Sequence, residues 1–308
     1  LAAGLLSQIA VASGGGVPHA GERRVEFHWN DADGVPQSLA YRELVEVDGL
    51  GGFDLTPLEV LALDAGSAGE FLVTQKARAA FAIRYRDFAI RDLDLFLANY
   101  QLQSIGAVEH VAGRDGLLFT VARLADGGTT HELVADLETG LILRAREYAP
   151  GGQLVSVLEY ESIDLGAPAG FVPFASPFTE TPLATELVPG QIAALDVGLP
   201  KWLPAGYELA EASRLELGER AWTKLVYTDG LDPLFLLAGD SLDMEPDFGV
   251  PLLGAVADDE SISEVPVLQR LPVGELTALR LVGAELDVLA VGSVPSDDLQ
   301  LFLESALP

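Results

Sequence analysis

Most of the first half of the chain consists of short runs in which apolar and polar residues alternate, separated by turn residues. The run 25–29, Val-Glu-Phe-His-Trp, is followed by Asp33-Gly34 and by a second run over 39–47. This is the pattern of two strands joined by a turn. Consecutive short strands joined by tight turns predict an antiparallel meander. The further strands that we expect cover 71–75, 79–90, 116–124, 131–137, 141–148 and 153–161.

Two segments of the first half favour helix. Leu93, Phe96, Leu97 and Tyr100 follow helical spacing, and Asp92 stands where it can cap the first turn. The apolar stretch 1–12 is too short to cross a bilayer and predicts a packing helix. Together these two helices can cover one face of the sheet.

The alternation disappears between residues 166 and 200, where proline, glycine and small residues dominate. Such a composition is typical of a domain boundary. We therefore predict a first domain over 1–168, a linker over 169–198 and a second domain over 199–308.

The second domain combines hairpins with a closing helix. Asp229-Gly230 lies between the runs 221–227 and 233–238, which is a strong hairpin signal, and 276–281 with 286–291 forms a second hairpin. Ser296 can cap a last helix whose apolar stripe is Leu299, Phe302, Leu303 and Leu307. The whole chain is thus expected to be an α+β protein made mostly of antiparallel β structure.

Charge and composition restrict the partners. The 47 acidic and 18 basic residues give a formal net charge of −29, which repels nucleic-acid phosphates, so we expect no nucleic-acid partner. A saline habitat would favour the same acidity, and the sequence leaves that alternative open. The lack of cysteine excludes disulfides and thiolate chemistry. Because the chain starts at Leu1 without an initiator Met, we expect that a signal or anchor has been removed.

No motif of enzymatic chemistry is present. The histidines at positions 19, 28, 110 and 131 do not pair at metal-ligand spacing, and there is no nucleophile elbow, dinucleotide fingerprint or phosphate-binding loop. We therefore expect no enzyme, no cofactor and no bound metal. The acidic residues between 240 and 264 are interpreted as a solvated loop, because their spacing departs from that of a calcium-binding loop.

Apolar side chains of the first domain are the candidate ligand-binding residues. A sheet this apolar either packs tightly on helices or curves around a cavity, and both arrangements bury the same residues. The candidates for an apolar cavity are Phe71, Phe81, Phe88, Phe96, Leu118, Phe119, Leu133, Leu141 and Leu143.

Five of the 18 basic residues lie within the short range 76–91 of this acidic chain. They can contact an anionic group, such as a lipid phosphate, or an acidic partner. Pairing with the chain's own carboxylates is the open alternative. The five are Lys76, Arg78, Arg84, Arg86 and Arg91.

Several short blocks resemble the RseB/MucB family of periplasmic sigma-factor regulators. They begin with Asn99-Tyr100 and Ala112-Gly113-Arg114, followed by Asp136-Leu137-Glu138-Thr139-Gly140-Leu141. Similar blocks in the second domain are Trp202-Leu203-Pro204, Tyr227-Thr228-Asp229-Gly230 and Val291-Gly292-Ser293-Val294-Pro295. The resemblance covers about two thirds of the chain, from about residue 95 to the end.

The resemblance implies a fold and a role. The first domain would be an unclosed half β-barrel, similar to the lipoprotein carriers LolA and LolB, with helices plugging its concave side. The protein would be periplasmic or extracytoplasmic, would sense a lipid or the acyl chain of a lipoprotein, and would bind the periplasmic domain of an anti-sigma factor in envelope-stress regulation. A lipid or lipoprotein carrier without a regulatory role is the alternative. The oligomeric state and an anchor before Leu1 stay open.

Overall fold

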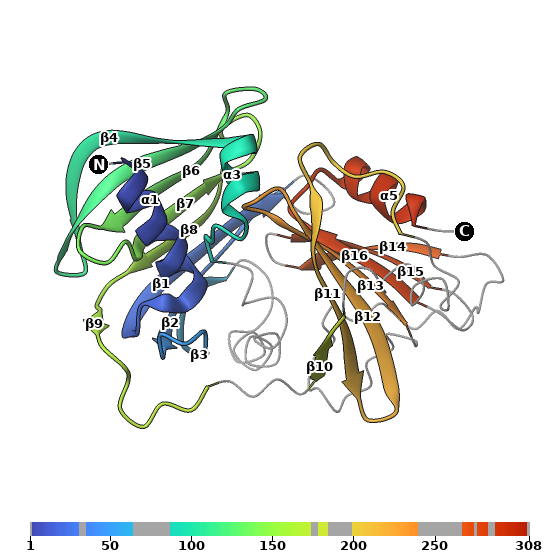
Figure 1. Cartoon of the computed structure of the whole chain (residues 1–308), viewed down its shortest axis with the longest axis horizontal. Helices are drawn as coiled ribbons and strands as arrows, with labels where there is room; N and C mark the ends of the chain where they lie inside the picture. Colours follow the sequence, from blue (N-terminus) through green and yellow to red (C-terminus); the bar gives the residue numbers. More distant parts are fainter. Residues whose placement is uncertain are drawn as a thin grey trace. The chain divides into compact units, whose positions relative to one another are not determined.

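The chain divides into two compact units, residues 1–175 and 176–308, each built on one antiparallel sheet (Figure 1). The coordinates come from a computed structural model. Residues described by the structure are 2–30, 35–63, 87–173, 178–183, 199–239, 267–273, 276–282 and 287–306. Each unit is described by itself.

The first unit contains a nine-stranded sheet in which neighbours pair antiparallel, so the predicted meander is confirmed. Eight strands follow the order β3-β2-β1-β8-β7-β6-β5-β4, and the short β9 (Asp164–Leu165) pairs with β1. Among the described strands β3 and β4 remain as edges, so the sheet is unclosed. The eight are β1 (His19–Asn30), β2 (Pro36–Val47), β3 (Phe53–Leu63), β4 (Tyr100–Val111), β5 (Arg114–Arg123), β6 (Thr129–Asp136), β7 (Ile142–Tyr148) and β8 (Leu154–Tyr160).

Both helices predicted for the first unit are present. They are α1 (Ala2–Val11), which continues into the wider turns of η1 (Ala12–Gly16), and α3 (Leu93–Asn99). The predicted cap of α3 is confirmed, because the Leu95 N–H donates to Asp92 Oδ1 at 2.9 Å. This bond satisfies one of the donors that a helix start leaves free. In Figure 1, α1 runs across the strands β5 to β8.

In the first unit, two long strands and one strand boundary differ from the sequence prediction, and in the second unit β10 (Thr179–Pro182), β11 (Glu208–Leu217) and β14 (Val267–Val273) were not predicted. The strand expected over 79–90 is not continued by residues 87–90, which are irregular, and 79–86 lie outside the described residues. The long strands missed in the first unit are β3 and β4. A bulge in β4 between Ser104 and Val108 breaks the alternation, and β3 tolerates Pro57 because it is an edge strand.

The second unit is a seven-stranded sheet with one helix. Its strand order is β10-β11-β12-β13-β16-β15-β14, and the hairpin predicted at Asp229-Gly230 joins β12 to β13. Strand β10 lies inside the segment 169–198. The elements are β10 (Thr179–Pro182), β11 (Glu208–Leu217), β12 (Arg220–Thr228), β13 (Pro233–Gly239), β14 (Val267–Val273), β15 (Leu276–Val282), β16 (Asp287–Gly292) and α5 (Ser296–Ser305).

The closing helix α5 packs on its own sheet as its apolar stripe predicts. Leu299, Phe302 and Leu303 are fully buried, and the Phe302 ring meets Tyr227 edge to face at 5.4 Å. The predicted Ser296 cap is wrong: Pro295 occupies the cap position and no side chain bonds there. Leu307 lies outside the described residues. In the described part of the chain, no helix has both the length and the apolar character needed to cross a bilayer.

Candidate functional site

The strand register of the first unit aligns a continuous apolar row across six strands. Its members lie opposite one another in successive strand pairs, from β5 through β6, β7, β8 and β1 to β2. All of them are buried, with at most 8% of their surface exposed. The row therefore forms the apolar face of this sheet. Its residues are Phe119, Leu133, Ala145, Leu158, Val25 and Tyr41.

A second row on the same face has a polar centre. Val121, His131, Glu147, Ser156 and Phe27 follow one another across the same strands, two residues along from the first row. Ser156 donates to Glu147 Oε2 at 3.0 Å. Three polar side chains thus interrupt a face that is otherwise apolar.

Burial shifts the titration of two of these groups. Desolvation lowers the pKa of His131 to about 4, and its Nδ1 has no hydrogen-bond partner. The Phe88 ring meets His131 edge to face at 5.3 Å. Burial raises the pKa of Glu147, an effect that the hydrogen bond from Ser156 partly offsets. Both groups are therefore biased toward their neutral forms.

The opposite face of the sheet carries charge. Alternation along β5, β6 and β7 turns Thr120, Glu132 and Arg146 away from the apolar row. Arg146 Nη1 lies 2.7 Å from Glu132 Oε1, and Arg144 Nη2 lies 2.7 Å from Glu109 Oε2. This face therefore differs from the apolar one: it carries ion pairs, one of them with the buried Arg144, beside a small apolar cluster of Val111, Val134 and Leu143.

Segments of the chain itself cover the apolar face. Ile9 of α1 and Phe96 of α3 are fully buried, and Phe88 contacts His131. The Ile90 N–H donates to Ser13 Oγ at 3.2 Å, which ties the end of α1 and η1 to the segment that carries Phe88. The face is thus occupied by protein side chains in this structure.

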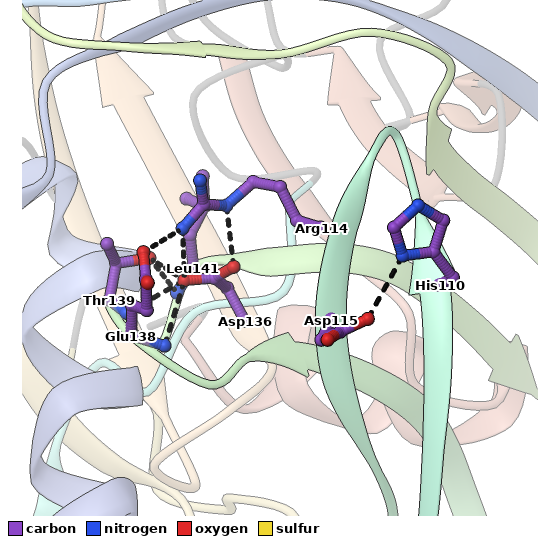
Figure 2. Close-up of polar contacts among 7 residues, drawn as sticks. All are labelled: His110, Arg114, Asp115, Asp136, Glu138, Thr139 and Leu141. Carbon is purple, nitrogen blue, oxygen red and sulfur yellow. Dashed lines mark hydrogen bonds and ion pairs between the residues drawn. The ribbon is translucent and has the colours of Figure 1, made fainter.

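The turn between β6 and β7 is organised by one carboxylate (Figure 2). Asp136 Oδ2 accepts from Arg114 Nε at 2.6 Å, and Asp136 Oδ1 accepts from the backbone N–H and hydroxyl of Thr139. Arg114 also reaches Glu138 Oε2 at 2.7 Å. These hydrogen bonds lower the pKa of Asp136 against the opposing effect of its burial. His110 and Asp115, also drawn in Figure 2, form a separate exposed pair at 3.0 Å.

The same turn packs directly against the backbone of α1. Gly140 has φ +75°, and a Cβ at this position would lie 2.7 Å from the carbonyl carbon of Gln8 and 2.8 Å from the Ile9 nitrogen. Only glycine combines this φ with such an approach of two backbones. The block Asp136-Leu137-Glu138-Thr139-Gly140-Leu141 therefore holds the first helix on the sheet.

A buried arginine joins three parts of the first unit. Arg23 of β1 donates to Glu43 of β2 at 2.7 Å and, through both terminal nitrogens, to Asp87 at 2.8 and 2.9 Å. The Asp87 and Glu43 carboxylates raise the pKa of Arg23 despite the opposing effect of desolvation. Tyr160 Oη lies 2.8 Å from His19 Nε2 beside this group. The network ties Asp87 to strands β1 and β2.

The structure brings most of the described apolar candidates into the interior. Phe88, Phe96, Phe119 and Leu133 are buried as described above, as are Leu141 and Leu143. Leu118 points to the face opposite Phe119 and packs, partly buried, on Val111, Val134 and Leu143. Phe71 and Phe81 lie outside the described residues.

The basic candidates remain predictions. Lys76, Arg78, Arg84 and Arg86 lie outside the described residues, as does the acidic segment 240–264. Arg91 is partly exposed directly before the cap of α3. Within the part of the chain that is described, no cluster of three or more His, Asp or Glu side chains is placed to hold a metal ion.

Sequence reasoning missed the polar members of the interior. Arg23, His131 and Glu147 were not recognised as residues that face inward. The signal was available in the alternation, since His131 precedes Leu133 by two positions and Arg23 precedes Val25 in the same way. A polar residue in phase with an apolar row is expected to be buried and to need a partner.

The chain is similar to known proteins in its structure. No family model matches the sequence, and no curated protein matches it. The chain is similar to a crystal structure of MucB, with 19% identity and a TM-score of 0.51, over 100% of this chain and 98% of that one. It is also similar to MucB in complex with MucA(peri), with 18% identity, a TM-score of 0.48, and coverage of 100% and 97%.

A third structure, the complex of MucA and MucB from Pseudomonas aeruginosa, gives 18% identity and a TM-score of 0.47, over 99% and 97% of the two chains. The likeness to the crystal structure of MucB, with its TM-score of 0.51, shows the fold and no more. The chain has a MucB-like fold, as the resemblance of its sequence blocks implied.

Proposed function

We propose that the protein is an extracytoplasmic regulator that binds the periplasmic part of an anti-sigma-type membrane protein and senses a lipid or lipoprotein. The observation that carries the proposal is the MucB-like fold, which extends over 100% of this chain and 98% of MucB. MucB itself has been crystallised in complex with MucA(peri). The proposed role is one of binding and not of catalysis.

Two features of the apolar face support the lipid part of the proposal. The six-strand row offers a continuous hydrocarbon surface, and every CH₂ group buried against such a surface contributes about 0.8 kcal/mol. The covering helix α1 has no charged side chain in either terminal turn. Because this face is covered in the structure, an acyl chain would enter only when a covering segment moves.

Partner binding is tested by calorimetric titration of the chain with the purified extracytoplasmic part of the anti-sigma protein from the same organism. We expect saturable binding, which an unrelated extracytoplasmic domain of similar size and charge does not reproduce. Equal or absent heat with both proteins would contradict the regulatory role.

Lipid binding is tested on the delipidated chain by native mass spectrometry with a zwitterionic lysophospholipid. We expect discrete adducts that correspond to bound lipid and that persist when the ionic strength is raised. Lipid adducts without partner binding would favour the alternative, a carrier with no regulatory role. Partner binding without adducts would limit the function to partner recognition.

A further inference from the structure

The edge strand β4 is long, exposed and paired on one side. Its twelve residues run from Tyr100 to Val111, all except 105–107 pair with β5, and no other described strand pairs with it. The residues from Gln103 to Val108 are all exposed, as are Gln101 and His110. Figure 1 shows β4 along the outer margin of the first unit. Such an edge offers free backbone donors and acceptors to another chain.

β4 is less protected against pairing than the edge strands β3, β10 and β14, and its own protection, the bulge after Ser104 and the charge of Glu109, lies beyond its first five residues. β3 contains Pro57, β10 contains Pro182 and β14 contains Pro272, and each of these strands also contains a charged residue. Proline and charge on an edge strand prevent pairing with other chains. β4 has no proline, and its segment 101–108 has no charged residue in a chain that is 21% charged.

Apolar side chains are concentrated along this edge. Ile105 and Val108 are 53% and 59% exposed on β4, and Leu97 and Leu124 are 52% and 50% exposed beside its first residue. The Leu124 N–H donates to the Asn99 carbonyl at 2.8 Å, which places Leu124 at the junction of α3 and β4. A strand added here would find both backbone partners and apolar contacts for alternate side chains.

The bulge of β4 determines where a strand can pair. Ser104 lies opposite Phe119, and Val108 lies opposite Leu117, so residues 105–107 bulge outward against one residue of β5. The regular stretch from Gln101 to Ser104 is left for pairing, since the Tyr100 N–H donates to the Phe96 carbonyl, and Ile105 follows at the end of this stretch.

We propose that β4 accepts an extended, net basic segment of a partner protein as an additional strand of the first sheet. A second copy of this chain is disfavoured as the occupant, since two molecules of net charge −29 repel each other. The same field attracts a basic segment and raises its rate of encounter. The inference goes beyond the proposed function, because it requires only that a partner has such a segment.

The probe for the test is a synthetic twelve-residue peptide of alternating Val and Lys, and its control is the same peptide with N-methyl groups on alternate backbone nitrogens. Hydrogen exchange of the full chain is followed by mass spectrometry. We expect amide exchange over residues 100–108 to slow about tenfold with the first peptide and to stay unchanged with the second, because N-methylation removes the donors that strand pairing needs.

A matched pair of variants locates the binding. Ile105→Lys places a charge on the edge, whereas Leu301→Lys makes the same change at a side chain of α5 that is 48% exposed. We expect the affinity for the Val-Lys peptide to fall about tenfold in the first variant and to stay unchanged in the second. Equal protection by both peptides, protection elsewhere alone, or equal affinity of both variants would overturn the proposal. Protection of β4 that rises with protein concentration, without peptide, would assign the edge to a second copy and also overturn it.

Discussion

Arg114 Nε lies 2.6 Å from Asp136 Oδ2, and this ion pair connects the start of β5 to the turn after β6. The Asp136 carboxylate is 1% exposed and also holds the Thr139 backbone and hydroxyl. The turn built in this way carries Gly140, on which α1 rests. The sequence block that resembles the RseB/MucB family thus has a structural role, which is to position a helix over the apolar face.

Replacement of Asp136 is expected to weaken this turn. Asp136→Asn removes the charge that pairs with Arg114 and converts an acceptor oxygen into a donor facing other donors. We expect the free energy of unfolding at pH 7 to fall by about 2–4 kcal/mol, as measured by urea denaturation. The control Asp115→Asn, in the exposed pair with His110, should have little effect.

The lowered pKa of Asp136 also predicts a pH dependence. A carboxyl whose pKa is lower in the folded state stabilises the fold above its unfolded pKa, and that contribution is lost as the pH falls through the folded value. The stability difference between the wild-type chain and Asp136→Asn should therefore shrink below about pH 4. A difference that stays constant from pH 7 to pH 3 would contradict this assignment.

Gly140→Ala should dislodge α1. The new methyl group would collide with the backbone of Gln8 and Ile9, in addition to the strain of φ +75°. Gly113→Ala is the matched control, because its φ of +78° imposes the same strain and no atom lies within 4 Å. We expect Gly140→Ala to lose about 1–3 kcal/mol more stability than the control, with faster hydrogen exchange in residues 2–11. Equal exchange of residues 2–11 in both variants would argue against a close contact between Gly140 and α1.

His131 is expected to make the chain less stable in mild acid. Its folded pKa of about 4 lies below the ordinary value of 6.5, so the unfolded chain takes up the proton first as the pH falls. Between pH 7 and pH 5 this costs about 2 kcal/mol. The raised pKa of Glu147 acts in the opposite direction, and this contribution is the same in the wild-type chain and in a variant at position 131.

The matched variant for this effect is His131→Leu, which removes the titrating group and the unpartnered Nδ1 and places an apolar side chain in the same buried position. We expect the variant to lose about 2 kcal/mol less than the wild-type chain between pH 7 and pH 5 in urea denaturation. Identical pH profiles would show that His131 does not titrate as a buried group.

The Arg23 network predicts a recovery experiment. Arg23→Met removes the guanidinium that pairs with the Glu43 carboxylate, which is 1% exposed, and should cost about 3–5 kcal/mol. The double variant Arg23→Met, Glu43→Leu should recover most of this loss, because the buried Glu43 carboxylate is removed together with the arginine. Thermal and urea unfolding of the two variants measure the difference. A double variant no more stable than the single one would show that Arg23 acts through Asp87.

Local pattern was sufficient to predict many elements of the fold. Alternation gave the strands around Phe119, Leu133 and Leu143, and the Asp92 cap located α3. The blocks around Asp136 and Asp229 marked turns, which side-chain bonds to nearby backbone stabilise. These features depend on residues close together in the sequence.

The organisation of the site depends on contacts between residues that are far apart in the sequence. Local sequence pattern does not predict such contacts. The row from Phe119 to Tyr41 exists only through the pairing of six strands. The contact of Gly140 with α1 and the ion pair of Arg23 with Asp87 join segments that are distant in sequence. The bulge of β4 concealed that strand, because residues 105–107 interrupt its alternating run.

The most direct test of the proposed function couples its two ligands in one titration. The full chain is titrated with the extracytoplasmic part of the anti-sigma protein, first delipidated and then saturated with a zwitterionic lysophospholipid. The account predicts measurable affinity in the delipidated state and an affinity about tenfold or more lower with lipid, a coupling of about 1.4 kcal/mol. The same affinity in both states, or none in either, would contradict it.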